Sequence, residues 1–208
     1  MIDPGRPAGR NVLRRGASEL DLELAIVGFA ALWRSDRLRP TALLPNHGGV
    51  GEAAAALAGR GRAELDDNGR LVGIHGLTLR ASRHSFTVAA TTHRTWCAFD
   101  AIGIPAALSL DADTHTDCST CHRRVDVRIE RGEPKANGAV LWLPTEAVTN
   151  LLTEFCATAD LYCCAAHVDE AIGTSQVEGT ITNLDEAAAL GRETWADIAH
   201  LRPALVGN

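Results

Sequence analysis

The 208-residue sequence has no long hydrophobic run, no excess of positive charge and no phosphate-binding motif. No apolar stretch approaches the roughly 18 residues of a membrane span, which argues against a membrane protein. The net charge of −6 argues against general nucleic-acid binding, because such binding needs a basic face. The sequence also lacks a P-loop, a glycine-rich dinucleotide fingerprint, an internal repeat and a nucleophilic serine motif.

The N-terminal segment contains Arg, Pro and Gly but no apolar core of the kind found in a secretory signal. We therefore expect a disordered tail over residues 1–17 and a cytoplasmic protein. In a reducing compartment, the six cysteines are expected to be free thiols rather than disulfides. Their roles would then be catalysis, metal binding or packing.

The first ordered part of the chain has the signals of a small helical module over residues 18–80. Ser18 and Asp21 form a capping-box pattern that predicts a helix to about Arg34. The Ala-rich segment 50–58 predicts a second helix, and the turn residues 66–70 predict a hairpin between strands 63–65 and 71–74. This outline is winged-helix-like. Acidic neighbours and an Ala-rich second helix favour a packing module over a DNA-binding one.

The remaining part of the chain, residues 81–208, mixes strands and helices without a strict βαβ repeat. We expect strands at 85–89, 125–129, 139–143 and 161–165. We expect helices beginning near Cys97, running from Pro144 to about Cys156, and running from the Asn183–Glu186 capping pattern to about Leu201. This arrangement predicts an α+β fold in which the N-terminal module packs on a larger core.

The segment Thr95-Trp96-Cys97-Ala98-Phe99-Asp100 carries the first candidate chemistry. Cys97 and Asp100 share one face if the segment is helical. With Thr95 as N-cap, Cys97 would lie in the first turn, where the helix dipole lowers a thiol pKa. The Asp100 carboxyl group could then take the thiol proton. Taken singly, each residue is better explained by packing or capping than by catalysis, because a lone cysteine on a helix is more often a small buried hydrophobe.

Several motifs together resemble the organomercurial (alkylmercury) lyases over roughly residues 71–195. The matching segments are Gly76-Leu77-Thr78-Leu79, Trp96-Cys97-Ala98-Phe99-Asp100, Pro105-Ala106, Cys118 and Phe155-Cys156. The resemblance implies that Cys97, Cys156 and Asp100 are the catalytic and mercury-binding residues. It also implies an organomercurial substrate, small thiols and a mercuric reductase as partners, no organic cofactor, and a role in mercury resistance and detoxification.

The residue types explain how such a site would work. Mercury is a soft metal and thiolate is the softest protein ligand, so Cys97 and Cys156 suit it. Two thiolates would weaken the mercury–carbon bond, and Asp100 would protonate the carbon, releasing a hydrocarbon and leaving bound Hg²⁺. Trp96, Phe99 and Phe155 are candidate apolar walls that would raise the pKa of Asp100.

The remaining thiols depart from the family pattern. Cys118 begins Cys118-Ser119-Thr120-Cys121-His122, where the lyases usually have a Thr-Gly turn. Cys118 and Cys121 have the spacing of half a zinc site, and Cys163, Cys164 and His167 could supply the other half. A polar loop with neighbouring thiols and a relay that passes Hg²⁺ to an acceptor are the alternatives.

Two other functions remain open from the sequence. One is a non-catalytic soft-metal or zinc-binding protein on the same fold, with Cys118, Cys121, Cys163 and Cys164 as ligands. The other is a metal-sensing regulator that binds DNA through the winged-helix-like module. The lyase would need Asp100 for turnover, whereas a binding protein would retain the metal without it. A regulator would bind duplex DNA with a steep salt dependence.

Overall fold

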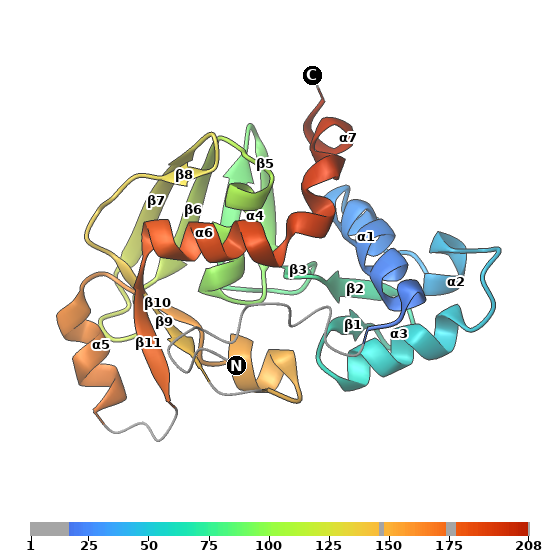
Figure 1. The fold of residues 1–208 in the computed structure, drawn as a ribbon, viewed down its shortest axis with the longest axis horizontal. Coiled ribbons are helices and arrows are strands. Elements are labelled where there is room, and N and C mark those ends of the chain that lie inside the picture. The colour runs from blue at the N-terminus through green and yellow to red at the C-terminus, as the bar shows by residue number, and fades with distance from the viewer. Residues whose placement is uncertain (1–16, 146–147, 174–177, 208) are drawn as a thin grey trace, which may run out of the picture.

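The N-terminal helices pack against one end of a long sheet (Figure 1). The structure is a computed structural model that describes residues 17–145, 148–173 and 178–207, so the predicted tail lies almost entirely outside it. Helix α1 (Glu19–Trp33) begins after Ser18, whose side chain caps the Asp21 N–H while the Asp21 carboxylate caps the Ser18 N–H. This confirms the predicted capping box. Helices α2 (Pro40–Leu43) and α3 (Val50–Gly59) follow.

The larger sheet contains eight strands, and every pairing in it is antiparallel. Its spatial order is β1-β2-β3-β5-β4-β6-β7-β8. The strands are β1 (Ala63–Leu65), β2 (Leu71–Ile74), β3 (Leu77–Thr78), β4 (Ser85–Val88), β5 (Thr91–Thr95), β6 (Ala112–Asp117), β7 (Arg124–Glu130) and β8 (Glu133–Pro134). The predicted 63–65 and 71–74 hairpin is confirmed, with Asp66 accepting backbone N–H groups of Asn68 and Arg70 inside the turn.

A smaller antiparallel sheet has the order β10-β9-β11, formed by β9 (Val140–Pro144), β10 (Asp160–Tyr162) and β11 (Gly179–Asn183). The helix predicted to begin at Pro144 is wrong there, because Pro144 pairs with Gly179 at the end of β9. A π-helical segment (Leu151–Cys156) begins only after Asn150, whose side chain accepts the Thr153 N–H. The strand predicted over 161–165 ends at Tyr162, and α5 (Ala165–Ile172) begins three residues later.

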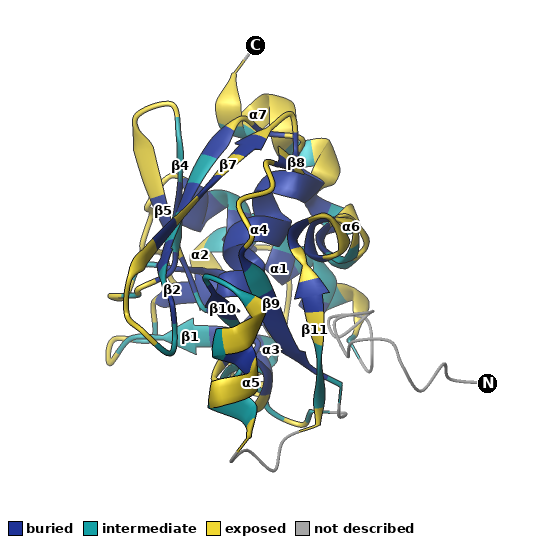
Figure 2. Ribbon diagram, turned by 90° about the vertical axis from the view of Figure 1, so that its left-hand side faces the viewer, coloured by how far each residue is buried: buried dark blue, intermediate teal, exposed yellow. Residues whose placement is uncertain are grey.

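Helix α4 (Ala98–Ala107) is the centre of the fold, and all of its residues are buried. Figure 2 shows it as buried along its length, with the exposed residues on the outer elements. Apart from Asp100 its residues are apolar or glycine, as expected for a helix that is enclosed on every side. It packs on α6 (Leu184–Thr194) at Gly103 and Gly191, where a Cβ on Gly191 would lie 2.3 Å from the Gly103 Cα. After α6 the chain continues through a 3₁₀ segment (Ala196–Leu201) into α7 (Arg202–Val206).

The structure is α+β, as predicted. The long sheet continues across residue 80, because β3 pairs with β2 on one side and with β5 on the other. The hairpin that follows the N-terminal helices therefore belongs to the same sheet as strands from the rest of the chain. The winged-helix-like character of the N-terminal module and a domain boundary at residue 80 stay predictions.

Candidate active site

Cys97 lies at the point where β5 leads into α4, and it is fully buried. The prediction that Thr95 caps the helix and that Cys97 lies in its first turn is wrong. Cys97 is itself the N-cap, with φ −146° and ψ 176°, and Thr95 instead donates its hydroxyl to the Cys97 carbonyl at 3.0 Å. The N-cap position turns the Cys97 side chain toward the first turn of α4, where Asp100 lies.

Asp100 completes a capping box with Cys97. Its Oδ2 accepts the Cys97 N–H at 3.0 Å, and the Asp100 N–H reaches back to the Cys97 side chain. The turn between β2 and β3 covers the carboxyl group from the other side. Gly76 there has φ +92°, and a Cβ at this position would approach the Asp100 Cγ to 3.1 Å. Glycine therefore serves both the backbone conformation and the close approach.

Cys156 is the last residue of the π-helical segment and is buried. The start of this segment is tied to the end of α3, because the Leu151 N–H donates to the Arg60 carbonyl at 3.0 Å. The Asn150 side chain lies so close to Gly61 that a Cβ there would be 2.1 Å from its Oδ1. The end of α3 thus positions the segment that carries Cys156.

The two sulfurs and a carboxylate oxygen of Cys97, Cys156 and Asp100 all lie within 4.8 Å of one another. The structure therefore brings together the three residues that the sequence resemblance selected. Residues 59 positions apart in the chain converge because α4 and the π-helical segment meet in the core. The arrangement places two sulfur ligands for a soft metal beside one carboxyl group that can carry a proton.

Burial raises the pKa of all three groups. It raises the pKa of the Cys97 thiol well above its usual range, and the hydrogen bond with Cys156 and the Asp100 charge raise it further. The helix terminus therefore does not produce the lowered thiol pKa that the sequence suggested. The hydrogen bond with Cys97 lowers the pKa of Cys156, but burial and the charges of Asp100 and Glu64 outweigh it. Both resting thiols keep their protons near neutrality.

The Asp100 carboxyl group is the one that changes protonation near neutrality. Burial raises its pKa to about 7, although hydrogen bonds from the Cys97 thiol and from the Cys97 and Trp96 backbone favour the ionised form. At pH 7 it is therefore divided between the acid and the carboxylate. A group with this pKa can accept and return a proton in one reaction cycle.

Aromatic side chains line this part of the core. Phe99 lies edge-to-face against Phe155 at a centroid distance of 6.0 Å and near Trp195 at 5.3 Å. The indole N–H of Trp96 donates to the Glu64 carboxylate at 2.6 Å. Of these residues, Trp96, Phe99 and Phe155 were predicted from the sequence, whereas Glu64 and Trp195 were not. Glu64 lies on the short strand β1, and no motif in the surrounding sequence identifies it as part of a site.

The extra thiols form a second group, in which Cys118, Cys121, Cys163 and His167 have ligand atoms within 4.8 Å of one another. Cys164, which was also predicted as a ligand from the sequence, is not a member of this group and instead lies at the N-cap position of α5. All six cysteines are free thiols.

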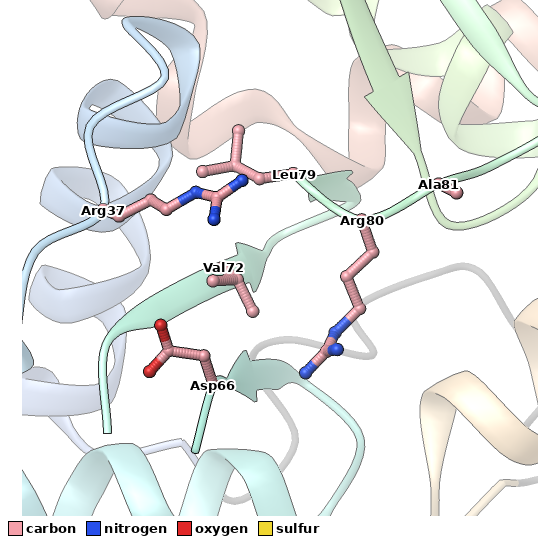
Figure 3. A pocket seen from close by; sticks show the side chains of 6 residues that line it. All are labelled: Arg37, Asp66, Val72, Leu79, Arg80 and Ala81. Atoms are coloured by element: carbon pink, nitrogen blue, oxygen red, sulfur yellow. The ribbon is translucent and has the colours of Figure 1, made fainter. Parts of the chain in front are cut away.

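A hollow of about 480 Å³ lies apart from both groups of thiols (Figure 3). It is lined by Arg37, Asp66, Val72, Leu79, Arg80 and Ala81. None of these side chains carries sulfur, so soft-metal chemistry has no ligand there.

In the described part of the chain, no helix is both long and apolar enough to cross a bilayer.

Comparison with known proteins gives consistent matches. The family model for MerB, alkylmercury lyase, matches residues 77–196. The alkylmercury lyase of Pseudomonas putida is 33% identical over 108 residues, which are 50% of this chain and 47% of that protein. The chain thus spans about half the length of this relative. The alkylmercury lyase of Bacillus cereus is 24% identical over 160 residues, 74% of this chain and 72% of that protein.

The fold is also shared with a solved structure. The mercury-bound form of MerB2 superposes with a TM-score of 0.82 at 17% identity, covering 90% of this chain and 96% of that one. The family match extends over more than half of the chain and includes Cys97, Asp100 and Cys156. By its sequence and its fold, the chain belongs to the alkylmercury lyase family of enzymes.

Proposed function

We propose that this protein cleaves the carbon–mercury bond of organomercurials by protonolysis, with Cys97 and Cys156 as mercury ligands and Asp100 as the proton carrier. The observation that carries this proposal is the convergence of two thiols with a carboxyl group whose pKa is about 7. Family membership supports the reaction class, and the donor set supports mercury as the metal of the substrate.

The first step is ligand exchange on the organomercurial. The Cys97 sulfur bonds to mercury and displaces the small thiolate that the substrate carries, which leaves with the proton of the Cys97 thiol. Mercury coordination replaces the proton on sulfur, so the high thiol pKa does not prevent binding. The apolar walls formed by Phe99 and Phe155 suit the organic group of the substrate.

The second step brings Cys156 to the metal. The ionised Asp100 carboxylate accepts the Cys156 proton as the second sulfur–mercury bond forms. Two thiolates donate electron density to mercury and make the bound carbon more basic. The Asp100 carboxyl group then protonates that carbon, and the mercury–carbon bond breaks. One organomercurial thiolate and two protein thiols become one hydrocarbon, one small thiol and Hg²⁺ held by two sulfurs.

Release of the product needs an incoming ligand of equal softness. Small thiols can replace the protein sulfurs one at a time, because thiolate exchange transfers a soft metal without freeing it. A mercuric reductase is the acceptor that the sequence analysis expected, and it stays a prediction together with a cytoplasmic location. No organic cofactor takes part in this scheme.

The experiment is release of benzene from a phenylmercury salt in the presence of excess small thiol. Wild-type protein is compared with Asp100→Asn, which keeps an oxygen to cap the Cys97 N–H, and with Cys164→Ser as a matched control outside the site. We expect wild type and Cys164→Ser to release benzene, and Asp100→Asn to be slower by about 10²-fold or more, as for loss of a general acid.

The same experiment separates catalysis from binding. A non-catalytic mercury-binding protein would hold the phenylmercury in both wild type and variant and release no benzene. Equal benzene release by wild type and Asp100→Asn would contradict the proton-carrier role of Asp100. Circular dichroism of each variant confirms that the comparison is between folded proteins.

A further inference from the structure

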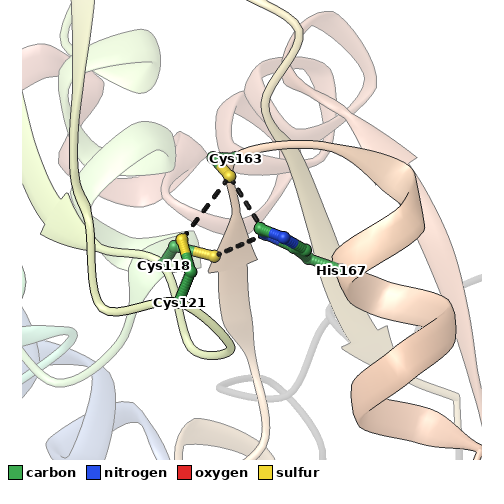
Figure 4. Close-up of side chains that lie close together, drawn as sticks. All are labelled: Cys118, Cys121, Cys163 and His167. Carbon is green, nitrogen blue, oxygen red and sulfur yellow. Dashed lines mark hydrogen bonds between the residues drawn. The ribbon is translucent and has the colours of Figure 1, made fainter.

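Three sulfurs and one imidazole nitrogen meet at the junction of the two sheets, outside the proposed mercury site. Figure 4 shows Cys118 and Cys121 on the loop after β6, and Cys163 and His167 on the segment that leaves β10 and enters α5. The three sulfurs and the His167 Nδ1 all lie within 4.8 Å of one another. The proposed lyase reaction uses none of them.

The spacing of these atoms fits a tetrahedral metal ion. At zinc–sulfur bonds of about 2.3 Å and zinc–nitrogen bonds of about 2.0–2.1 Å, two sulfurs lie about 3.8 Å apart and sulfur and nitrogen about 3.6 Å apart. In this structure the Cys121 and Cys163 sulfurs are 3.9 Å apart, and the Cys118 sulfur is 3.5 Å from the His167 Nδ1. The Cys163 sulfur is 3.1 Å from the same nitrogen, a distance shorter than the sulfur–nitrogen separation of about 3.6 Å in a tetrahedral zinc site.

The backbone around the four side chains is already organised for ligation. The loop closes on itself through the Cys118 N–H to the Arg123 carbonyl at 2.9 Å and the His122 N–H to the Cys118 carbonyl at 2.9 Å. Backbone N–H groups of Cys121 and Thr120 point at the Cys118 sulfur. This is how a Cys-x-x-Cys turn holds both sulfurs on one side.

Two further contacts join the loop to the other segment. The Thr120 hydroxyl donates to the His167 carbonyl at 2.8 Å, and the Ser119 N–H donates to the Leu161 carbonyl at 3.2 Å. The β6 loop of the large sheet is thereby fixed against β10 of the small sheet. The four ligand atoms need only small shifts to enclose an ion.

We propose that Cys118, Cys121, Cys163 and His167 form a closed structural zinc site that joins the two sheets. Four protein ligands fill a tetrahedron and leave no open position, which is the arrangement of a structural rather than a catalytic zinc. Binding replaces the thiol protons, which pass to solvent, and neutral His167 contributes its Nδ1 lone pair. The site is independent of the mercury chemistry.

The first test is metal content of the full chain. Wild-type protein and a Cys97→Ser/Cys156→Ser variant, which lacks the proposed mercury ligands, are incubated with zinc chloride, dialysed and analysed by mass spectrometry of the metal. We expect one zinc ion per chain in both, because the site lies outside the mercury pair. The Cys164→Ser variant is the matched control, since it removes a neighbouring thiol that is not a ligand, and it should also hold one zinc.

The second test removes a ligand that is exposed and outside the core. Cys121→Ser should lower the zinc affinity by more than about 100-fold, because loss of a second-shell partner alone costs up to that much. Zinc binding by Cys121→Ser equal to that of Cys164→Ser would overturn the proposal. So would a wild-type protein that holds no zinc after this treatment.

Cobalt provides a readout that needs no variant. Co²⁺ added to the Cys97→Ser/Cys156→Ser protein should give strong thiolate-to-metal charge transfer and the intense visible bands of a tetrahedral ion, and zinc should displace them. Weak octahedral bands would overturn the assignment. An intact protein mass that is lower by two hydrogen atoms and contains no metal, showing a Cys121–Cys163 disulfide even in the presence of a reductant, would overturn it too.

Discussion

Replacing Asp100 by Asn tests whether burial sets the protonation of the proposed active site. The folded-state pKa of Asp100 is about 7, compared with an unperturbed value of 3.8, and burial is the largest cause. Below about pH 3.8 the carboxyl group is protonated in both folded and unfolded chains. As the pH rises toward about 7, the unfolded chain loses this proton while the folded protein keeps it. The free energy of unfolding therefore falls with rising pH through this window.

The magnitude follows from the size of the shift. Each pKa unit corresponds to about 1.4 kcal/mol, so about three units give about 4 kcal/mol in total. Between about pH 4.5 and about pH 8, the wild-type free energy of unfolding should fall by about 3 kcal/mol relative to Asp100→Asn. Asn keeps an oxygen that can accept the Cys97 N–H, so the cap is retained.

The assay is urea unfolding of both metal-free proteins at a series of pH values, followed by circular dichroism. The difference between the two proteins is the quantity of interest, because groups common to both cancel in it. That matters here, since the buried histidines contribute with the opposite sign. Two stability curves that run parallel across the window would refute the raised Asp100 pKa and, with it, the proposed acid.

Two further predictions concern residues that shape the core. His93 stacks on Trp33 at a centroid distance of 4.0 Å, and burial lowers its pKa to about 4. As the pH falls below about 6.5, His93 becomes protonated in the unfolded chain but not in the folded protein, which destabilises the fold. The free energy of unfolding of His93→Phe, measured in urea, should therefore gain about 2 kcal/mol relative to wild type between about pH 8 and about pH 5. A difference that does not change with pH would contradict this. Gly103→Ala should cost about 1–3 kcal/mol by the same method, because its Cβ would lie 2.3 Å from the Trp195 ring. Gly48→Ala, with nothing within 4 Å, is the control, and equal stability of the two variants would argue against a tight α4–α6 contact.

Local signals in the sequence were sufficient for the elements they govern. The Ser18–Asp21 and Asn183–Glu186 pairs both form the capping boxes that their spacing predicts. The turn after Asp66 joins the two predicted strands. In each case the stabilising contacts lie within a few residues, so the side-chain order alone specifies them.

Elements that depend on distant partners were misjudged. Pro144 followed by polar residues looks like a helix start, but the strand register with Gly179 extends β9 to this residue. Strand β5 reads Thr-Thr-His-Arg-Thr, so its sequence shows no alternation of apolar and polar residues, although His93 and Thr95 are buried in the fold. Its identity depends on pairing with β3 and β4. Such pairings are properties of the assembled sheet rather than of the segment.

The features of the candidate site also fall into those that the sequence predicts and those that depend on the assembled fold. Family motifs identified Cys97, Asp100 and Cys156, and the three side chains do converge. Helix position suggested a lowered Cys97 pKa, whereas burial raises it, because the degree of burial depends on every element around α4. In the second group, Cys-x-x-Cys spacing identified one half, but only the fold distinguishes Cys163 and His167 from Cys164.

The most direct test of the central claim is the reaction in deuterated water with a phenylmercury salt and excess small thiol. The exchangeable protons of Asp100 and both thiols are then deuterons. Protonolysis predicts benzene that carries one deuterium, formed in equal amount to Hg²⁺, with Asp100→Asn slower by about 10²-fold or more. Absence of benzene, or benzene without deuterium, would contradict cleavage of the carbon–mercury bond by proton transfer from this site.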